Sequence, residues 1–221
     1  MVREMQEILP GVRFVDLDGH RRIATETIAP KSVYGERIID GFRTWDPYRS
    51  KLAALLLKSR SPMPIGLSRD SIVLYLGAAT GTTVSHVSDI VREGLVYAVE
   101  ISPRSMRQLI QLAESRQNII PILGDAARPE SYSRFVEPVD IVYQDVAQRN
   151  QAEIASLNSC RYLKKDGTLV LMIKTRSIDS TASPKEIRAL EIELLKGLEV
   201  LSVIDLLPFQ HDHWAVVAKK V

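Results

Sequence analysis

Hydrophobic and polar positions divide the chain into two regions with different patterns. In the first region, short apolar pieces at 12–15 and 22–25 flank an Asp-Gly pair. Short apolar runs joined by such a turn predict antiparallel strands. From residue 70 onward, near-continuous apolar runs alternate with helical patterns. We therefore expect a small N-terminal β-strand region at 1–45 and one larger domain at 46–221.

The second region predicts a sheet. Its predicted strands lie at 72–76, 95–99, 119–123, 139–144, 168–173, 200–207 and 214–218. Apolar strands separated by helices are typical of a parallel sheet covered on both faces. The segment 208–213 is too short for a helical crossover, so the last strand should be antiparallel. This predicts an α/β, Rossmann-like fold with a mostly parallel seven-stranded sheet. Such a core is typical of S-adenosylmethionine-dependent methyltransferases, whereas dinucleotide dehydrogenases lack the antiparallel hairpin.

A helix is expected between the two regions. Asp46 is a suitable N-cap and Pro47 fits the first helical position. The helix should continue through Lys51 to Leu57 and end at the Pro-containing segment 61–64.

Composition narrows the class of protein. The 221 residues include 45% hydrophobic and 25% charged residues, which is ordinary for a globular protein. The first five residues lack the apolar core of a signal peptide, and no apolar run is long enough to span a bilayer. The single cysteine, Cys160, excludes an internal disulfide framework. We expect a cytoplasmic protein without a membrane segment. Because the net charge is only +2, tight RNA binding would need a partner.

Candidate ligand-binding residues follow the predicted strands. In an open α/β sheet, ligands bind beyond the carboxyl ends of the strands. The loop after 72–76 holds Gly77 and Ala79, which permit a close approach, and then Thr82 and Thr83 at a helix start, where a carboxylate can bind. The spacing differs from the pyrophosphate-binding G-x-G-x-x-G pattern.

Acids follow the next strands. Glu100 lies 23 positions after Gly77, where an acid can accept hydrogen bonds from ribose hydroxyls. Asp125 with Ala126 could contact an adenine, and the segment 145–148 follows the fourth strand. Each acid alone could be a helix cap. Together they indicate a pocket for a nucleoside that carries an amino acid.

Several stretches resemble the archaeal fibrillarins, a family of RNA ribose 2′-O-methyltransferases. They are 75–89 (YLGAATGTTVSHVSD), 96–100 (VYAVE), 145–148 (DVAQ), 173–174 with 177–179 (IK and SID), and 208–209 with 212–213 (PF and DH). The resemblance covers nearly the whole chain. Three positions depart from the family pattern: Thr80 replaces serine, Ile101 an aromatic residue, and Trp214 alanine. Trp214 could alter access to the neighbouring histidine.

The resemblance implies S-adenosyl-L-methionine as cofactor. It implies that Thr82 and Thr83 contact the methionine part, Glu100 and Ile101 the ribose, and Asp125 and Ala126 the adenine. Residues Asp145, Val146, Ala147 and Gln148 would line the methyl end, with Gly77 and Ala79 in the loop. The catalytic set would be Lys51, Asp145, Lys174 and His213, among which the proton acceptor is undecided.

The resemblance also implies a place in a box C/D guide ribonucleoprotein. The partners would be a Nop-type scaffold protein, a kink-turn-binding ribosomal-type protein, the box C/D guide RNA, and rRNA or tRNA as substrate. A guide RNA would choose the nucleotide, so the enzyme needs no RNA-recognition module of its own.

Other functions remain open from the sequence. A protein glutamine methyltransferase and a non-catalytic, cofactor-binding scaffold both fit the same core. Amino-group methyltransferases show an Asn/Asp-Pro-Pro-aromatic motif that 145–148 lacks, and Cys160 is badly placed for a cytosine C5 enzyme. His211 and His213 could share a face as metal ligands, but no third ligand is evident, so no metal site is expected. We expect His86, Trp45 and Trp214 to be packing residues.

Overall fold

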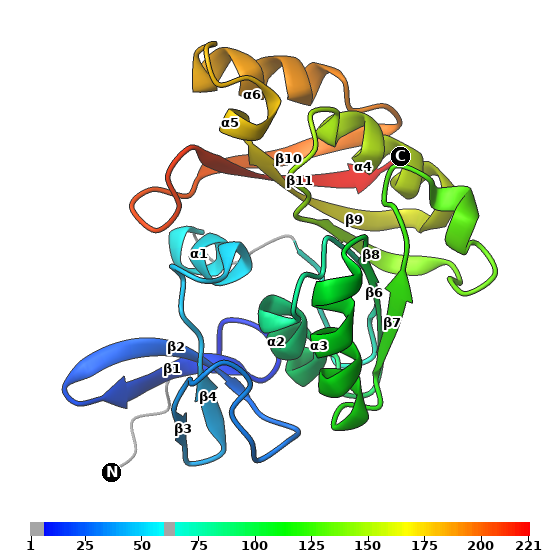
Figure 1. Cartoon of the computed structure of the whole chain (residues 1–221). Coiled ribbons are helices and arrows are strands. Elements are labelled where there is room, and N and C mark those ends of the chain that lie inside the picture. Colours follow the sequence, from blue (N-terminus) through cyan, green and yellow to red (C-terminus); the bar gives the residue numbers. More distant parts are fainter. Residues whose placement is uncertain (1–6, 60–64) are drawn as a thin grey trace.

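The computed structural model describes residues 7–59 and 65–221, which form two sheets joined by a segment containing the first helix (Figure 1). The first five residues, which were expected to lack a signal-peptide core, and the helix end expected at 61–64 fall outside these ranges. Within them, every helix is too short or too polar to cross a membrane.

The N-terminal sheet has four antiparallel strands in the order β1-β2-β4-β3. They are β1 (Val12–Leu17), β2 (His20–Glu26), β3 (Ile38–Ile39) and β4 (Phe42–Thr44). Asp18 and Gly19 join β1 to β2 with φ angles of 53° and 78°. Positive φ at both turn residues matches the right-handed twist of a hairpin. The predicted strand pair is therefore confirmed.

The larger sheet has seven strands in the order β10-β11-β9-β8-β5-β6-β7. They are β5 (Ile72–Leu76), β6 (Leu95–Glu100), β7 (Ile119–Leu123), β8 (Val139–Gln144), β9 (Leu163–Lys174), β10 (Leu198–Asp205) and β11 (His213–Lys220). The strands from β9 to β7 pair in parallel, and β11 is antiparallel to both β9 and β10. This confirms the predicted methyltransferase-type sheet.

Helices cover both faces of this sheet (Figure 1). One face packs against α1 (Lys51–Lys58), α2 (Thr82–Ile90) and α3 (Pro103–Glu114). The other packs against α4 (Gln151–Tyr162) and α6 (Pro184–Glu193), with the short α5 (Thr175–Ile178) and the 3-10 turn η1 (Pro129–Tyr132) nearby. Side chains along each strand alternate between the two cores, since Val73 and Tyr75 lie in one and Leu74 and Leu76 in the other.

The start of α1 differs from the prediction. The helix begins at Lys51, and Ser50 is its N-cap, with the side chain accepting a hydrogen bond from the Ala53 amide. Asp46 instead closes a preceding turn, in which its side chain accepts from the Tyr48 amide at 2.9 Å. The prediction of an Asp46 cap was wrong because an Asp-Pro pair also suits a tight turn. As a result, Lys51 lies at the very beginning of α1.

The N-terminal sheet is fastened to α2 by a buried ionic network. Asp89 of α2 lies 2.8 Å from Arg43 Nη1 and 2.6 Å from Arg116 Nη1, and all three side chains are fully buried. His86 of α2 contacts Thr25 and Tyr34 through its two ring nitrogens. It also stacks on Trp45 with ring centroids 4.6 Å apart, which is the packing role expected for both residues.

Candidate active site

A cavity of about 360 Å³ opens at the carboxyl ends of β5, β6 and β8. It lies where the strand order reverses, because β6 and β8 flank β5 on opposite sides. The lining residues are Gly77, Ala79, Val99, Glu100, Ile101, Gly124, Ala126, Asp145, Val146, Ala147 and Gln148. The structure therefore brings together nine of the residues expected at the cofactor, in a cavity of the usual size for a small-molecule site.

The glycine loop approaches the end of β8 very closely. Gly77 has a φ of 82°, and a Cβ atom built there would lie 2.3 Å from the carbonyl oxygen of Asp145. The Asp145 amide donates to the carbonyl of Leu76 at 2.9 Å, which extends the strand pairing to this point. Only glycine fits this conformation and this spacing. The close contact fixes Asp145 relative to the loop that forms one wall of the cavity.

Glu100 is nearly buried at the end of β6. Its Oε2 accepts from the Ala79 amide at 2.7 Å, and its Oε1 accepts from the Ser102 amide at 2.8 Å. Two charge-assisted hydrogen bonds hold the carboxylate in one orientation beside the cavity. The remaining lone pairs of its oxygens can accept hydrogen bonds from a ligand hydroxyl.

Three expected cofactor residues lie outside the cavity lining. Thr83 is buried, and its hydroxyl contacts the Ser50 hydroxyl at 3.0 Å. Thr82 lines a different cavity, described below. Asp125 accepts from the Gln148 side chain at 3.2 Å and from the Ala127 amide at 2.9 Å, so it positions a lining residue. The assignment of these residues to the cofactor stays a prediction.

Lys51 and Asp145 form an ion pair at the edge of this cavity. Lys51 Nζ lies 2.7 Å from Asp145 Oδ2, and the two side chains are 18% and 21% exposed. The pair joins the first turn of α1 to the residue that follows β8. The Lys51 amine therefore has a defined partner and does not simply extend into solvent along the helix surface.

Lys174 and His213 lie directly opposite each other on β9 and β11. Residues paired in this way point to the same face of a sheet. His213 Nδ1 lies against the carbonyl oxygen of His211 and must donate to it, because a carbonyl can only accept. Burial lowers the pKa of His213, and the positive charges of Lys51 and Lys174 lower it further.

His213 therefore has an open acceptor. With the proton on Nδ1, the neutral ring has its lone pair on Nε2. This atom is buried and has no hydrogen-bond partner among residues 7–59 and 65–221. The charges of Lys51, Asp145 and Lys174 all act on the ring, so the four expected catalytic residues share one neighbourhood. The described residues contain no group of three His, Cys, Asp or Glu side chains arranged for a metal.

Two glutamines support this cluster and were not predicted. Gln151 Oε1 accepts from the Lys174 amide at 2.9 Å, and Gln151 Nε2 donates to the Lys174 carbonyl at 3.3 Å. Gln144 Nε2 in turn donates to the Gln151 carbonyl at 2.7 Å. Both side chains are fully buried. A glutamine inside the apolar strand 139–144 was the only sequence signal for this arrangement, since an uncharged buried amide needs a specific partner.

The side chain of Trp214 does not lie next to that of His213, where it was expected to alter access to the histidine. Neighbouring residues on a strand point to opposite faces, so Trp214 faces the core covered by α6. Its ring lies under the guanidinium carbon of Arg188 at 4.5 Å. The expectation that Trp214 alters access to the histidine is wrong because of this alternation.

Comparisons with known proteins agree with this geometry. The chain matches the family described as fibrillarin over residues 3–221. It is 60% identical to the fibrillarin-like rRNA/tRNA 2′-O-methyltransferase of Methanothrix thermoacetophila, over 98% of this chain and all of that protein.

Two crystal structures are similar in both sequence and fold. Fibrillarin in a fibrillarin/Nop5p complex is 43% identical with a TM-score of 0.90, covering 98% of this chain and 100% of that one. Aeropyrum pernix fibrillarin with natively bound S-adenosyl-L-methionine is 45% identical with a TM-score of 0.88, covering 97% and 96% of the two chains. The match over nearly the whole length, together with the strand order and the cavity, shows that this chain belongs to the fibrillarin family.

Proposed function

We propose that this chain is a methyltransferase that transfers the methyl group of S-adenosyl-L-methionine to ribose 2′-hydroxyls of rRNA and tRNA. The observation that carries the proposal is the position of the Lys51–Asp145 pair at the edge of the cavity. A nucleoside site and a cluster of ionisable groups meet there, at the carboxyl edge of a methyltransferase-type sheet. The fibrillarin-like relative is named for this same activity.

The cavity residues fit the cofactor. Glu100 offers a fixed carboxylate for ribose hydroxyls, and the lining of Val99, Ile101, Ala126 and Val146 suits an adenine ring. Gly77 leaves room where a side chain would collide with the backbone of Asp145. When bound, S-adenosyl-L-methionine supplies a methyl group already activated by its sulfonium. The protein must then orient the acceptor hydroxyl, and orientation of this kind can contribute about 7–11 kcal/mol.

Methyl transfer requires the acceptor 2′-hydroxyl to lose its proton, and the ionisable residues next to the cavity can accept it. We assign proton acceptance to Nε2 of His213, because this ring is neutral, anchored through Nδ1 and otherwise without a partner in the described part of the chain. Lys51 holds Asp145 in place, and Lys174 lies opposite the histidine, where its charge can stabilise a developing alkoxide. A positioned base contributes about 10²–10⁴-fold to such a step.

The proposed setting is a box C/D guide ribonucleoprotein in the cytoplasm. A solved relative was crystallised as a fibrillarin/Nop5p complex, which supports a Nop-type scaffold as one partner. The balanced charge of 29 basic and 27 acidic residues supports dependence on partners for RNA binding. The kink-turn-binding protein and the guide RNA complete the proposed particle. A guide RNA would select the nucleotide by base pairing.

A leave-one-out assay tests this function. Labelled methyl incorporation into a guide-matched RNA is measured with this chain, the scaffold, the kink-turn protein and the guide RNA, and then with each one omitted. We expect site-specific methylation only with the full set, because mass action cannot replace positioning. Site-specific methylation by the isolated chain would contradict partner dependence. Absence of RNA methylation by the full set, with methylation of a glutamine-containing protein, would contradict the RNA activity itself.

A further inference from the structure

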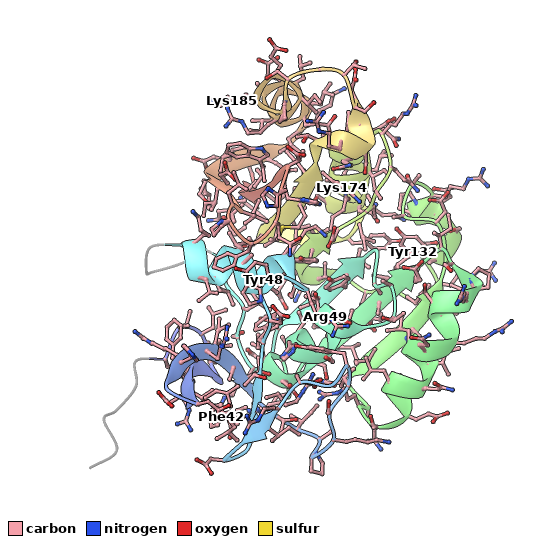
Figure 2. All side chains as sticks on the ribbon, turned by 60° about the vertical axis from the view of Figure 1, so that its left-hand side comes forward. Phe42, Tyr48, Arg49, Tyr132, Lys174 and Lys185 are labelled. Atoms are coloured by element: carbon pink, nitrogen blue, oxygen red, sulfur yellow. The ribbon has the colours of Figure 1, made fainter. Side chains whose placement is uncertain are left out.

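A second cavity lies on the other side of the glycine loop. Its volume is about 560 Å³, and we call it the basic cavity. It is lined by Lys31, Ser32, Val33, Tyr34, Arg49, Thr80, Thr82, Gln108, Gln111, Leu112, Ser115 and Arg116. Ala79 lines the cofactor cavity and Thr80 lines the basic cavity, so the two share this loop as a wall. Figure 2 shows Arg49 between the N-terminal strands and the larger sheet.

The lining of the basic cavity is suited to an anion. Lys31, Arg49 and Arg116 supply three positive charges, and the hydroxyl and amide groups around them can donate hydrogen bonds. None of the described residues that line the cavity is an aspartate or a glutamate. The whole chain has nearly equal numbers of acidic and basic residues. A cavity lining without acidic residues is therefore a local excess of positive charge.

Arg116 has unused donors beside this cavity. The residue is 1% exposed, and Nη1 donates to Asp89 Oδ1 at 2.6 Å and to the Ser85 carbonyl at 3.1 Å. Its Nε and Nη2 are buried and have no acceptor in the described ranges, 7–59 and 65–221. A buried donor without an acceptor is unfavourable, and more so when it is charged. Arg116 therefore adds a buried, incompletely paired guanidinium to the wall of the basic cavity.

The positive charge at the cavity is not cancelled by nearby acids. Arg43 and Arg116 share Asp89, and Arg43 also pairs with Glu36, so these four groups balance one another. Lys31 and Arg49 then remain as two uncompensated charges, since neither forms an ion pair with a described residue.

Arg49 and the loop hold fixed positions at the cavity. Arg49 Nη1 donates to the Tyr34 carbonyl at 3.2 Å, and its guanidinium lies over the Tyr34 ring. A Cβ at Gly81 would lie 2.4 Å from Leu112, so the loop is packed tightly on α3. Thr80 is therefore held in a rigid wall of the cavity, which reduces the entropy that binding would cost.

We propose that the basic cavity holds a backbone phosphate of the RNA strand that is methylated. Arg49 precedes Lys51 by two residues, so the segment that lines the basic cavity continues directly into the residue that pairs with Asp145. A phosphate held there would fix the direction of the strand across the glycine loop without reading its sequence. This subsite rests on the proposed RNA activity, and it gives the chain a direct role in placing the strand that the guide RNA selects.

The test compares two double variants of the full chain. Lys31→Gln/Arg49→Gln removes the two exposed cations of the basic cavity and leaves Arg116, which is part of the buried network. Lys165→Gln/Lys185→Gln makes the same charge change at exposed residues away from it. Affinity for a fluorescent single-stranded RNA is measured by anisotropy at several salt concentrations. We expect the first variant to bind about tenfold more weakly and its log–log salt slope to fall by roughly 0.7, as for one lost phosphate contact.

Chemical changes in the RNA identify the phosphate. A neutral methylphosphonate is placed at one position after another of the same RNA. We expect one position at which this change weakens binding by the wild type but has little effect on Lys31→Gln/Arg49→Gln. Equal RNA affinity of the two double variants would overturn the subsite.

A parallel titration separates RNA from free anions. Inorganic phosphate is added while the amide chemical shifts of Thr80 and Ser115 are followed. Phosphate binding that depends on Lys31 and Arg49, without any effect on RNA affinity, would assign the cavity to a free anion and overturn the proposal. Methyl transfer by the assembled particle is measured separately. Transfer without the expected change in RNA affinity would contradict the subsite alone, and RNA binding at the subsite without transfer would contradict the proposed function.

Discussion

Lys51 and Asp145, which are 94 positions apart in the chain, meet with Nζ 2.7 Å from Oδ2 at the junction of α1 and β8. If they act as one unit, Lys51→Met and Asp145→Asn should each lower the single-turnover rate by about 100-fold, and the double variant should lose little more. Rapid-quench measurements in the assembled particle check this. Additive losses would show that the two residues act independently.

Lys174 should act on the acceptor side. We expect Lys174→Ala to lower the single-turnover rate by about 100-fold or more, because a charge aimed at the developing alkoxide is lost. Calorimetry should show S-adenosylmethionine affinity within about twofold of the wild type, because Lys174 does not line the cofactor cavity. Lys185→Ala, an exposed lysine on α6 (Figure 2), serves as the control. An unchanged rate in Lys174→Ala would remove this residue from the mechanism.

The pH profile should identify His213 as the base. Burial and the nearby lysines lower its pKa, so the ring loses its proton below the ordinary value of 6.5. A base works in its neutral form, so the single-turnover rate should rise with pH below 6.5 and be level above it. In His213→Ala the level rate should fall by about 100-fold and the acidic limb should disappear. An acidic limb that persists in this variant would assign the base to another group.

Gly77 has a matched control in Gly19. Their φ angles are 82° and 78°, so alanine is strained by about 1–2 kcal/mol at either position. Only at Gly77 would the added Cβ also meet the backbone of Asp145, whereas nothing lies within 4 Å at Gly19. We expect Gly77→Ala to weaken cofactor binding at least tenfold and Gly19→Ala to leave it unchanged, as measured by calorimetry. Equal affinities would show that the loop can move away from Asp145.

His86 should make stability depend on pH. Burial, and then the charges of Arg43 and Arg116, hold its pKa well below 6.5 in the folded protein. Below pH 6.5 the unfolded chain therefore binds more protons, so the free energy of unfolding is largest above 6.5 and falls as pH decreases.

Urea unfolding between pH 5.5 and 7.5 measures this dependence. The slope contributed by His86 should reach about 1.4 kcal/mol per pH unit at most, and His86→Asn should lose it. The pKa of His213 is also lowered, so this residue can contribute to the slope too. The slope measured in His213→Asn separates its contribution from that of His86. An identical slope in wild type and His86→Asn would show that the histidine is not kept neutral by the network around it.

Much of the cofactor site could be predicted from the sequence. Glu100 and Asp145 each follow an apolar strand, and the carboxyl ends of parallel strands share one edge of a sheet. Their position at one edge therefore followed from the predicted parallel sheet alone. Gly124 and Val99, which also line the cavity, carried no such signal, because a strand valine and a loop glycine occur throughout ordinary α/β domains.

Side-chain partners were less predictable. Thr82 and Thr83 were expected at the cofactor from their place at a helix start, yet one lines the basic cavity and the other contacts Ser50. Successive residues of a helix project about 100° apart, so one helix start can face several sites. The N-cap of α1 is Ser50 and not the predicted Asp46. Aspartate and serine are both common N-cap residues, so residue type alone could not choose between the two positions.

The sequence by itself determined the sheet and the edge at which ligands bind. Apolar periodicity and connection length are local properties, and they require seven strands with β11 reversed. Tertiary structure alone decided that Asp145 pairs with Lys51. It also decided that, among the residues described, His213 Nε2 has no partner and two Arg116 nitrogens have no acceptor. These depend on atoms brought together from distant segments to within about 3 Å, and at that range a small shift of a helix changes which partner is bound.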